Sequence, residues 1–166
     1  MSRRRGRVPV RAEVVTGANL SRMSDTTAEA PRFPRTLEEW TTAAEGTLIE
    51  RLGIRLTEVA ADRTAGTMPV AGNTQPAGLL HGGATASLAE TLGSVAAQQH
   101  AGPGRAAVGL ELNATHHRGV RSGSVHGVAT ALHLGRSTAA YEIVVTDDDG
   151  RRVCTARLTC MVLDAR

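Results

Sequence analysis

The order of periodic segments predicts an α+β fold, with a curved antiparallel sheet wrapped around one long central helix. Two observations lead to this prediction. Residues 82–99 contain no proline and carry an apolar pattern of helical spacing, whereas beyond residue 104 the pattern changes to the period of two that is typical of strands. Several strands that follow a single helix favour α+β over an alternating α/β architecture.

The chain has the length of one domain, and a basic segment precedes its periodic part. It contains 166 residues, of which 41% are hydrophobic, enough for a core. Residues 1–35 hold eight of the 19 arginines but only three acidic side chains, and they show no apolar periodicity. We therefore expect a disordered basic arm over residues 1–35 and a folded domain over residues 36–166.

The basic arm has two interpretations. The cluster of Arg3, Arg4, Arg5 and Arg7 fits contact with nucleic acid or a membrane surface, but it also fits a solvated tail. No stacking aromatic residue or recognition helix accompanies the charge, so the tail is favoured and nucleic-acid binding is not expected. The chain has no long apolar run, which argues against a secretory signal and a membrane span.

The first elements of the domain are a short helix and two strands. Thr36 and Glu39 have the spacing of a capping box, which predicts a helix that continues to about Glu45. Alternating residues from Ile54 towards Val70 predict a strand region with one turn inside it.

The central helix is predicted from Gly82 to Gln99, with a length of about 27 Å at 1.5 Å per residue. Its apolar positions recur at helical spacing, so the helix is expected to be largely buried: Ala84, Leu88, Leu92 and Val95. Glu90 lies two turns inside this segment. A carboxylate among small and apolar neighbours calls for a functional or structural reason.

Four strands are predicted after a loop at residues 102–104. In the first, alternate residues form one half-buried face: Val108, Leu110, Leu112 and Ala114. Residues 125–134, 138–146 and 152–163 form the others, and the Asp147–Gly150 segment predicts a hairpin turn between the last two. The exposed edges and spare face of such a sheet favour oligomerisation.

The two cysteines and six histidines do not predict a metal site. Cys154 and Cys160 have the even spacing that places both on the core face of the last strand, as expected for reduced thiols in a cytoplasmic protein. The histidines form no helical His-Glu motif and do not join the cysteines at zinc-ligand spacing.

Four stretches of the sequence carry a family resemblance. They are LIERLGIRLTEVAADRTAGTMPV from residue 48, QPAGLLHGGATASLAETLGSVAA from residue 75, GLELNATHHRGVRSG from residue 109 and LHLGR from residue 132. They resemble the hotdog-fold thioesterases that hydrolyse aryl-CoA and aryl-carrier-protein thioesters. The resemblance covers about residues 36–163. It implies a hotdog fold and hydrolysis of a thioester of an aromatic or medium-chain acyl group.

The resemblance also implies roles for the segment from residue 75 to residue 94. Its catalytic set comprises Glu90 as the carboxylate, Gly82 as the backbone oxyanion donor, Gln75 as a partner of the thioester carbonyl, and His81 and Ser94 as orienting groups. Whether Glu90 attacks directly or activates water stays open. In this family the site lies at a dimer interface, so Glu90 is expected to act with the partner's Gln75 and His81.

The chemistry of these residues agrees with the implied roles. The N–H groups of Gly82 and Gly83 lie in the first helical turn, where they lack intrahelical acceptors and where the helix dipole is positive. Glu90 and Ser94 are an i, i+4 pair, so the hydroxyl group can orient the carboxylate. Thioester hydrolysis needs such an oxyanion donor and a base or nucleophile. Structural alternatives stay open for two residues, because His81 also fits a helix cap and Ser94 also fits simple packing.

A second set of residues is expected to bind the substrate. The positive charge around His116 and Arg118 suits the phosphates of coenzyme A, although a solvated strand end is the alternative. The complete substrate-binding or CoA-binding set is Gly83, His116, Arg118, Arg121, His133, Arg136 and Ser137. Coenzyme A would be part of the substrate, and no separate cofactor is expected.

Two other function classes compete with an enzyme of this kind. One is a non-catalytic acyl-CoA sensor that uses the basic arm on nucleic acid, but the arm lacks a helix-turn-helix pattern. The other is a hotdog hydratase, which would use an aspartate and histidine pair in a different motif. The complete set from Gln75 to Ser94 favours the thioesterase. The resemblance also implies a homo-oligomer, a dimer that further assembles into a tetramer, without a membrane partner.

Overall fold

The computed structural model describes residues 33–165, so most of the basic arm predicted for residues 1–35 lies outside the described residues. The last positions of that segment contact the end of the long helix. The Arg35 guanidinium donates hydrogen bonds to the carbonyl oxygens of Gln98 and Gln99, at 3.1 and 3.3 Å. The Gln99 amide in turn donates to the carbonyl oxygen of Pro34 at 3.2 Å.

Two short helices, α1 (Leu37–Ala43) and α2 (Leu48–Arg51), precede the sheet. The predicted capping box is present at α1, because Thr36 Oγ1 accepts the Glu39 N–H while the Glu39 carboxylate accepts the Thr36 N–H. Helix α2 was not predicted from the sequence. Its four residues are too few to show a helical period, and its cap is Thr47, whose hydroxyl accepts the Ile49 N–H.

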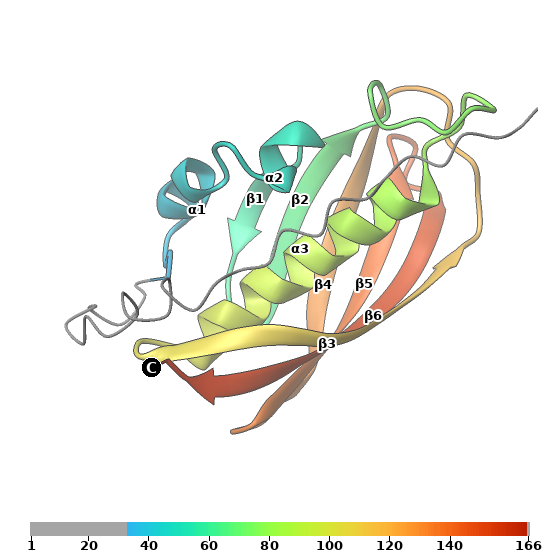
Figure 1. Cartoon of the computed structure of the whole chain (residues 1–166). Coiled ribbons are helices and arrows are strands. Elements are labelled where there is room, and N and C mark those ends of the chain that lie inside the picture. Colours follow the sequence, from blue (N-terminus) through green and yellow to red (C-terminus); the bar gives the residue numbers. More distant parts are fainter. Residues whose placement is uncertain (1–32, 166) are drawn as a thin grey trace, which may run out of the picture.

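Six strands form one antiparallel sheet, as predicted. They are β1 (Arg55–Val59), β2 (Arg63–Pro69), β3 (Arg105–His116), β4 (Ser124–Leu134), β5 (Thr138–Asp147) and β6 (Arg152–Asp164). The spatial order is β1-β2-β4-β5-β6-β3, so β3 lies at one edge and β1 at the other. The sheet curves around helix α3 (Gly82–Ala101), which crosses its inner face, as Figure 1 shows.

The core lies between α3 and the sheet. All four helix positions expected in the core are buried: Ala84, Leu88, Leu92 and Val95. Ala84, Leu88 and Leu92 pack in a cluster to which most strands contribute. Met68 from β2, Ile143 from β5 and Leu158 from β6 are fully buried in it. Among residues 33–165, no helix combines the length and the apolar character that a membrane span requires.

The alternation predicted for β3 is wrong in its first half. Val108 and Leu110 were expected on the buried face, but they are 50% and 54% exposed. The register with β6 shifts between Gly109 and Glu111, so Leu110 is the extra residue of a β-bulge. Because a bulge reverses the alternation, Ala107 rather than Val108 packs towards the core. A period of two cannot reveal a bulge, which depends on the pairing with another strand.

The hairpin and the cysteine face were predicted correctly. The turn between β5 and β6 is closed by Asp147, whose Oδ1 accepts the N–H groups of Asp149 and Arg151. Cys154 and Cys160 are buried on the core face of β6, and both are free thiols.

Candidate active site

The loop before α3 is fixed by a buried amide. Asn73 is only 7% exposed, and its side chain donates to the carbonyl oxygens of Leu52 and Pro69 at 2.7 and 2.9 Å. Its own carbonyl oxygen accepts the His81 N–H at 2.9 Å. Asn73 therefore sets where the helix begins. Sequence reasoning missed it, because an asparagine beside a glycine is equally typical of an exposed turn.

The N–H groups of Gly82 and Gly83, at the start of α3, differ in their hydrogen bonding. His81 is the N-cap, and its Nδ1 accepts the Gly83 N–H at 2.8 Å, which is the capping role that the sequence left open. Nδ1 is thus the unprotonated ring nitrogen of this contact. Within residues 33–165, the Gly82 N–H has no hydrogen-bond acceptor. The helix therefore presents one free backbone donor at its positive end.

A groove of about 340 Å³ opens at this donor. Its lining residues come from the loop before α3, the start of α3, the end of β3, the loop that follows β3, and β6: Gln75, Leu79, Leu80, Gly82, Thr85, His116, His117, Arg118, Gly119 and Val153. Gln75 Oε1 accepts the Ala77 N–H at 3.2 Å, which turns the amide nitrogen into the available donor of that side chain. Gln75 and Gly82, the two residues to which the resemblance gives a role at the thioester carbonyl, thus line the same groove of one chain.

His116, which the sequence placed only in the substrate-binding set, lies directly against the start of α3. A Cβ atom at Gly82 would be 3.0 Å from His116 Nε2, so the imidazole rests against the glycine. Arg118 lines the same groove, and Arg121 donates to the carbonyl oxygen of Ala77 at 3.4 Å. The groove therefore has a positively charged rim on the side of the Gln75–Gly78 loop.

Glu90 lies further along α3 and does not line this groove. The Ser94 hydroxyl donates to Glu90 Oε1 at 3.1 Å, and both side chains are half-buried. Eight residues separate Gly82 from Glu90, which corresponds to about 12 Å along the helix axis. Within one protomer, the carboxylate and the free N–H group are therefore too far apart to act on the same carbonyl.

The turn with His133, Arg136 and Ser137 lies at the opposite end of α3. The ring of His100, in the last turn of the helix, bonds to the carbonyl oxygen of Gly135 at 2.8 Å. The helix is about 30 Å long, so the turn is remote from Gly82 in the same protomer. The structure does not bring the two predicted CoA-binding clusters together within one chain.

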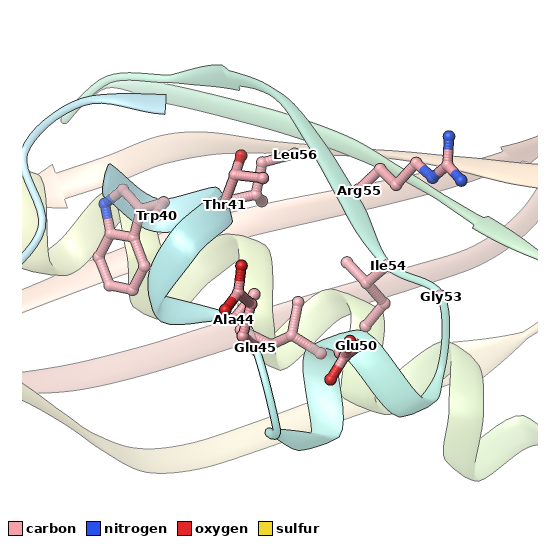
Figure 2. Close-up of a pocket in the computed structure, with 10 residues that line it drawn as sticks. Trp40, Thr41, Ala44, Glu45, Glu50, Gly53, Ile54, Arg55 and Leu56 are labelled. Carbon is pink, nitrogen blue, oxygen red and sulfur yellow. The ribbon is translucent and has the colours of Figure 1, made fainter. Parts of the chain in front are cut away.

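A larger cavity of about 530 Å³ lies elsewhere, between α1, α2 and β1. Figure 2 shows its lining, in which Trp40, Ile54 and Leu56 accompany the carboxylates of Glu45 and Glu50. None of the site residues predicted from the sequence lines it. The larger of these two cavities is therefore not the one that the predicted site residues line.

Comparison with known proteins agrees with the fold and with the enzyme class expected from the sequence. The sequence profile of the thioesterase superfamily matches residues 77–154. The proofreading thioesterase EntH of Cronobacter turicensis is 50% identical over 129 residues, which cover 77% of this chain and 94% of that protein. A Haemophilus influenzae thioesterase structure superposes with a TM-score of 0.75 at 37% identity, covering 81% of this chain and 94% of the other. A variant of a Pseudomonas aeruginosa thioesterase gives 0.75 at 41% identity, covering 81% and 98%.

A six-stranded antiparallel sheet that curves around one central helix is the hotdog architecture, and the solved thioesterase structures share it. The chain belongs to the thioesterase superfamily. The fold and the enzyme class predicted from the sequence are therefore confirmed.

Proposed function

We propose that the protein hydrolyses the thioester of an aromatic or medium-chain acyl group, carried by coenzyme A or by an acyl carrier protein. The observation that supports this most directly is the free N–H of Gly82, which faces a groove beside the Gln75 amide. The positive charge of Arg118 and Arg121, beside His116, suits the phosphates of coenzyme A. Coenzyme A is then part of the substrate, and the mechanism draws only on residues of the protein.

In the proposed reaction, the thioester carbonyl oxygen accepts hydrogen bonds from the Gly82 N–H and the Gln75 amide. These donors stabilise the negative charge that develops when the carbonyl carbon is attacked. Glu90 either removes a proton from the attacking water or attacks the carbon itself and forms an anhydride that water cleaves. In both routes the C–S bond breaks, the thiolate leaves and takes up a proton, and the acyl group ends as a carboxylate. Ser94 holds one oxygen of Glu90.

The proposed site requires a second copy of the chain. Gly82 and Glu90 are about 12 Å apart along α3, so a two-fold axis near Ala86 would place the Glu90 of one protomer beside the Gly82 of the other. Strand β3 is an edge strand that runs beside α3, and pairing of two β3 strands would supply such an axis. The same axis would carry the partner's Arg136 turn towards the groove. We propose this dimer, and its further assembly into a tetramer, as the working form.

The free thiols of Cys154 and Cys160 fit a protein that works in a reducing compartment, which we propose to be the cytoplasm.

Replacement of Glu90 tests the proposed function directly. We expect Glu90→Ala to abolish thiol release from benzoyl-CoA and related thioesters, because the reaction loses its base or nucleophile. The half-buried side chain is not part of the core, so the melting temperature and oligomeric state should stay close to those of the unchanged protein. Unchanged turnover in this variant would contradict the proposed role.

A substrate panel would identify the acyl group and its carrier. We would compare kcat/KM for aryl-CoA, aliphatic-CoA and aryl-carrier-protein thioesters. If the proposal is correct, at least one of these classes is hydrolysed, and Glu90→Ala removes that activity.

A further inference from the structure

We propose that Gly109, with the β-bulge that follows it, is a positioning residue that forms the seat of the Glu90 carboxylate. The inference rests on the proposed catalytic role of Glu90. A Cβ atom at Gly109 would lie 2.6 Å from Glu90 Oε1, 3.6 Å from the carboxyl carbon and 3.9 Å from Oε2. The carboxylate therefore occupies the space that the side chain of any other residue would take.

The bulge explains why a glycine faces the helix at this point. Leu112 and Ala114 on β3 pack towards the core, and an unbroken alternation would make Leu110 the next residue to face α3. The register shift leaves Leu110 exposed and turns Gly109 towards Glu90 instead. A bulge that re-aims one residue in this way is a recurrent feature beside active sites.

The remaining sides of the seat are Ser94 and Cys160. Ser94, one turn further along α3, donates to Glu90 Oε1 at 3.1 Å. Cys160 is the β6 partner of Gly109, and it is fully buried. Burial and the Glu90 charge raise the pKa of the Cys160 thiol to about 11, although the Ser94 hydrogen bond opposes the shift. The thiol is thus neutral near pH 7, and the carboxylate meets no second negative charge from it.

The experiment is Gly109→Ala in the full chain. We expect kcat to fall about tenfold to hundredfold with little change in KM, because a displacement of the carboxylate by about 1 Å is enough for a loss of this size. The melting temperature should change little, since alanine suits a strand at least as well as glycine. A crystal structure of the variant should show that the Ser94–Glu90 hydrogen bond is broken or the carboxylate displaced.

A double-mutant cycle tests whether Gly109→Ala acts by displacing the Glu90 carboxylate or by a general distortion of β3. In Glu90→Asp the carboxylate is withdrawn by one methylene, so the added methyl at position 109 has room. Gly109→Ala should therefore cost much less when it is combined with Glu90→Asp than when Glu90 is unchanged, a non-additive result. A matched control is Gly127→Ala on β4, whose Cβ would lie 2.5 Å from Leu92 Cδ1 on the apolar side of α3. It should lower the melting temperature and leave the kcat of the folded enzyme unchanged.

Three outcomes would contradict the proposed role of Gly109 in positioning Glu90. They are an unchanged kcat for Gly109→Ala, the same loss with and without Glu90→Asp, and an undisturbed Glu90–Ser94 pair in the crystal structure of the variant. The structure of the variant decides the question even if the proposed function fails. That failure would be visible separately, as an unchanged protein without thioesterase activity or as an active Glu90→Ala variant.

Discussion

At the residue scale, the two glycines at the start of α3 have different tasks. Gly83 donates its N–H to the His81 side chain, so this group contributes to capping the helix. The Gly82 N–H has no acceptor among residues 33–165, and the missing side chain of Gly82 leaves room for His116. The residue pattern alone offered the N–H groups of both glycines as donors, and the resemblance assigned the oxyanion role to Gly82. The cap reduces them to one, because a histidine side chain in the N-cap position reaches the second N–H group.

A comparison of two substitutions at Gly82 tests the contribution of its N–H group. Proline is tolerated at the first helical position, and the extended backbone of His81 (φ −70°, ψ 131°) suits a residue before proline. Gly82→Pro removes the N–H, whereas Gly82→Ala keeps it, and both add a Cβ beside His116. We expect kcat for the proline variant to be about 10²–10³-fold below that of the alanine variant. Equal kcat values in steady-state assays would show that Gly82 is not the oxyanion donor.

At the scale of elements, β6 carries two buried thiols against α3. The pKa of Cys160 is raised from 9.0 to about 11 by burial first and by the Glu90 charge second. Burial also raises the pKa of Cys154. Between pH 9.0 and about pH 11, the Cys160 thiol of the folded chain retains a proton that the same thiol has lost in the unfolded chain. The thiols therefore stabilise the fold below about pH 9, and this contribution falls as the pH rises towards 11.

Denaturation across this range tests the prediction. The urea midpoint of the unchanged protein is expected to fall between about pH 8.5 and 10.5. Cys160→Val has a similar volume and no titrating group, so its midpoint should fall less steeply. Other groups that titrate at high pH are common to both proteins, and only the difference between the two slopes is diagnostic. Parallel slopes would contradict the contribution of Cys160.

At the scale of the whole molecule, the proposed active site is divided between two copies. Each α3 contributes a donor at its start and a carboxylate about two turns further, and the distance between them prevents both from acting within one chain. The dimer we propose therefore contains two identical composite sites. Its β3 edges would become the centre of a continuous sheet, and no edge of β3 would stay open to other chains.

Mixing two inactive variants tests the composite site. In a heterodimer of Glu90→Ala and Gly82→Pro, one site has both intact residues and the other has neither. After unfolding and refolding together in equal amounts, random pairing should restore about a quarter of the activity of the unchanged protein. Each variant refolded alone is the control. No recovery, although heterodimers are detected by mass spectrometry, would indicate that each chain works by itself.

The sequence determined the features that depend on local spacing. The apolar stripe of α3, the Glu90–Ser94 pair and the core face of β6 follow from periods of 3.6 or 2 along the chain. The capping box at Thr36 follows from two residue types three positions apart. The structure agrees with each of these features. The resemblance of its motifs added the enzyme class, which the comparisons confirm.

Only the tertiary structure decided how distant segments meet. Four features depend on residues that are far apart in the sequence. They are the place of β3 at the sheet edge, the bulge in β3, the contact of His116 with Gly82 and the contact of Gly109 with Glu90. Periodicity describes which face of an element is apolar, but it does not contain the register between two strands. That register is fixed by packing of the whole sheet on α3, and it places a glycine rather than a leucine beside Glu90.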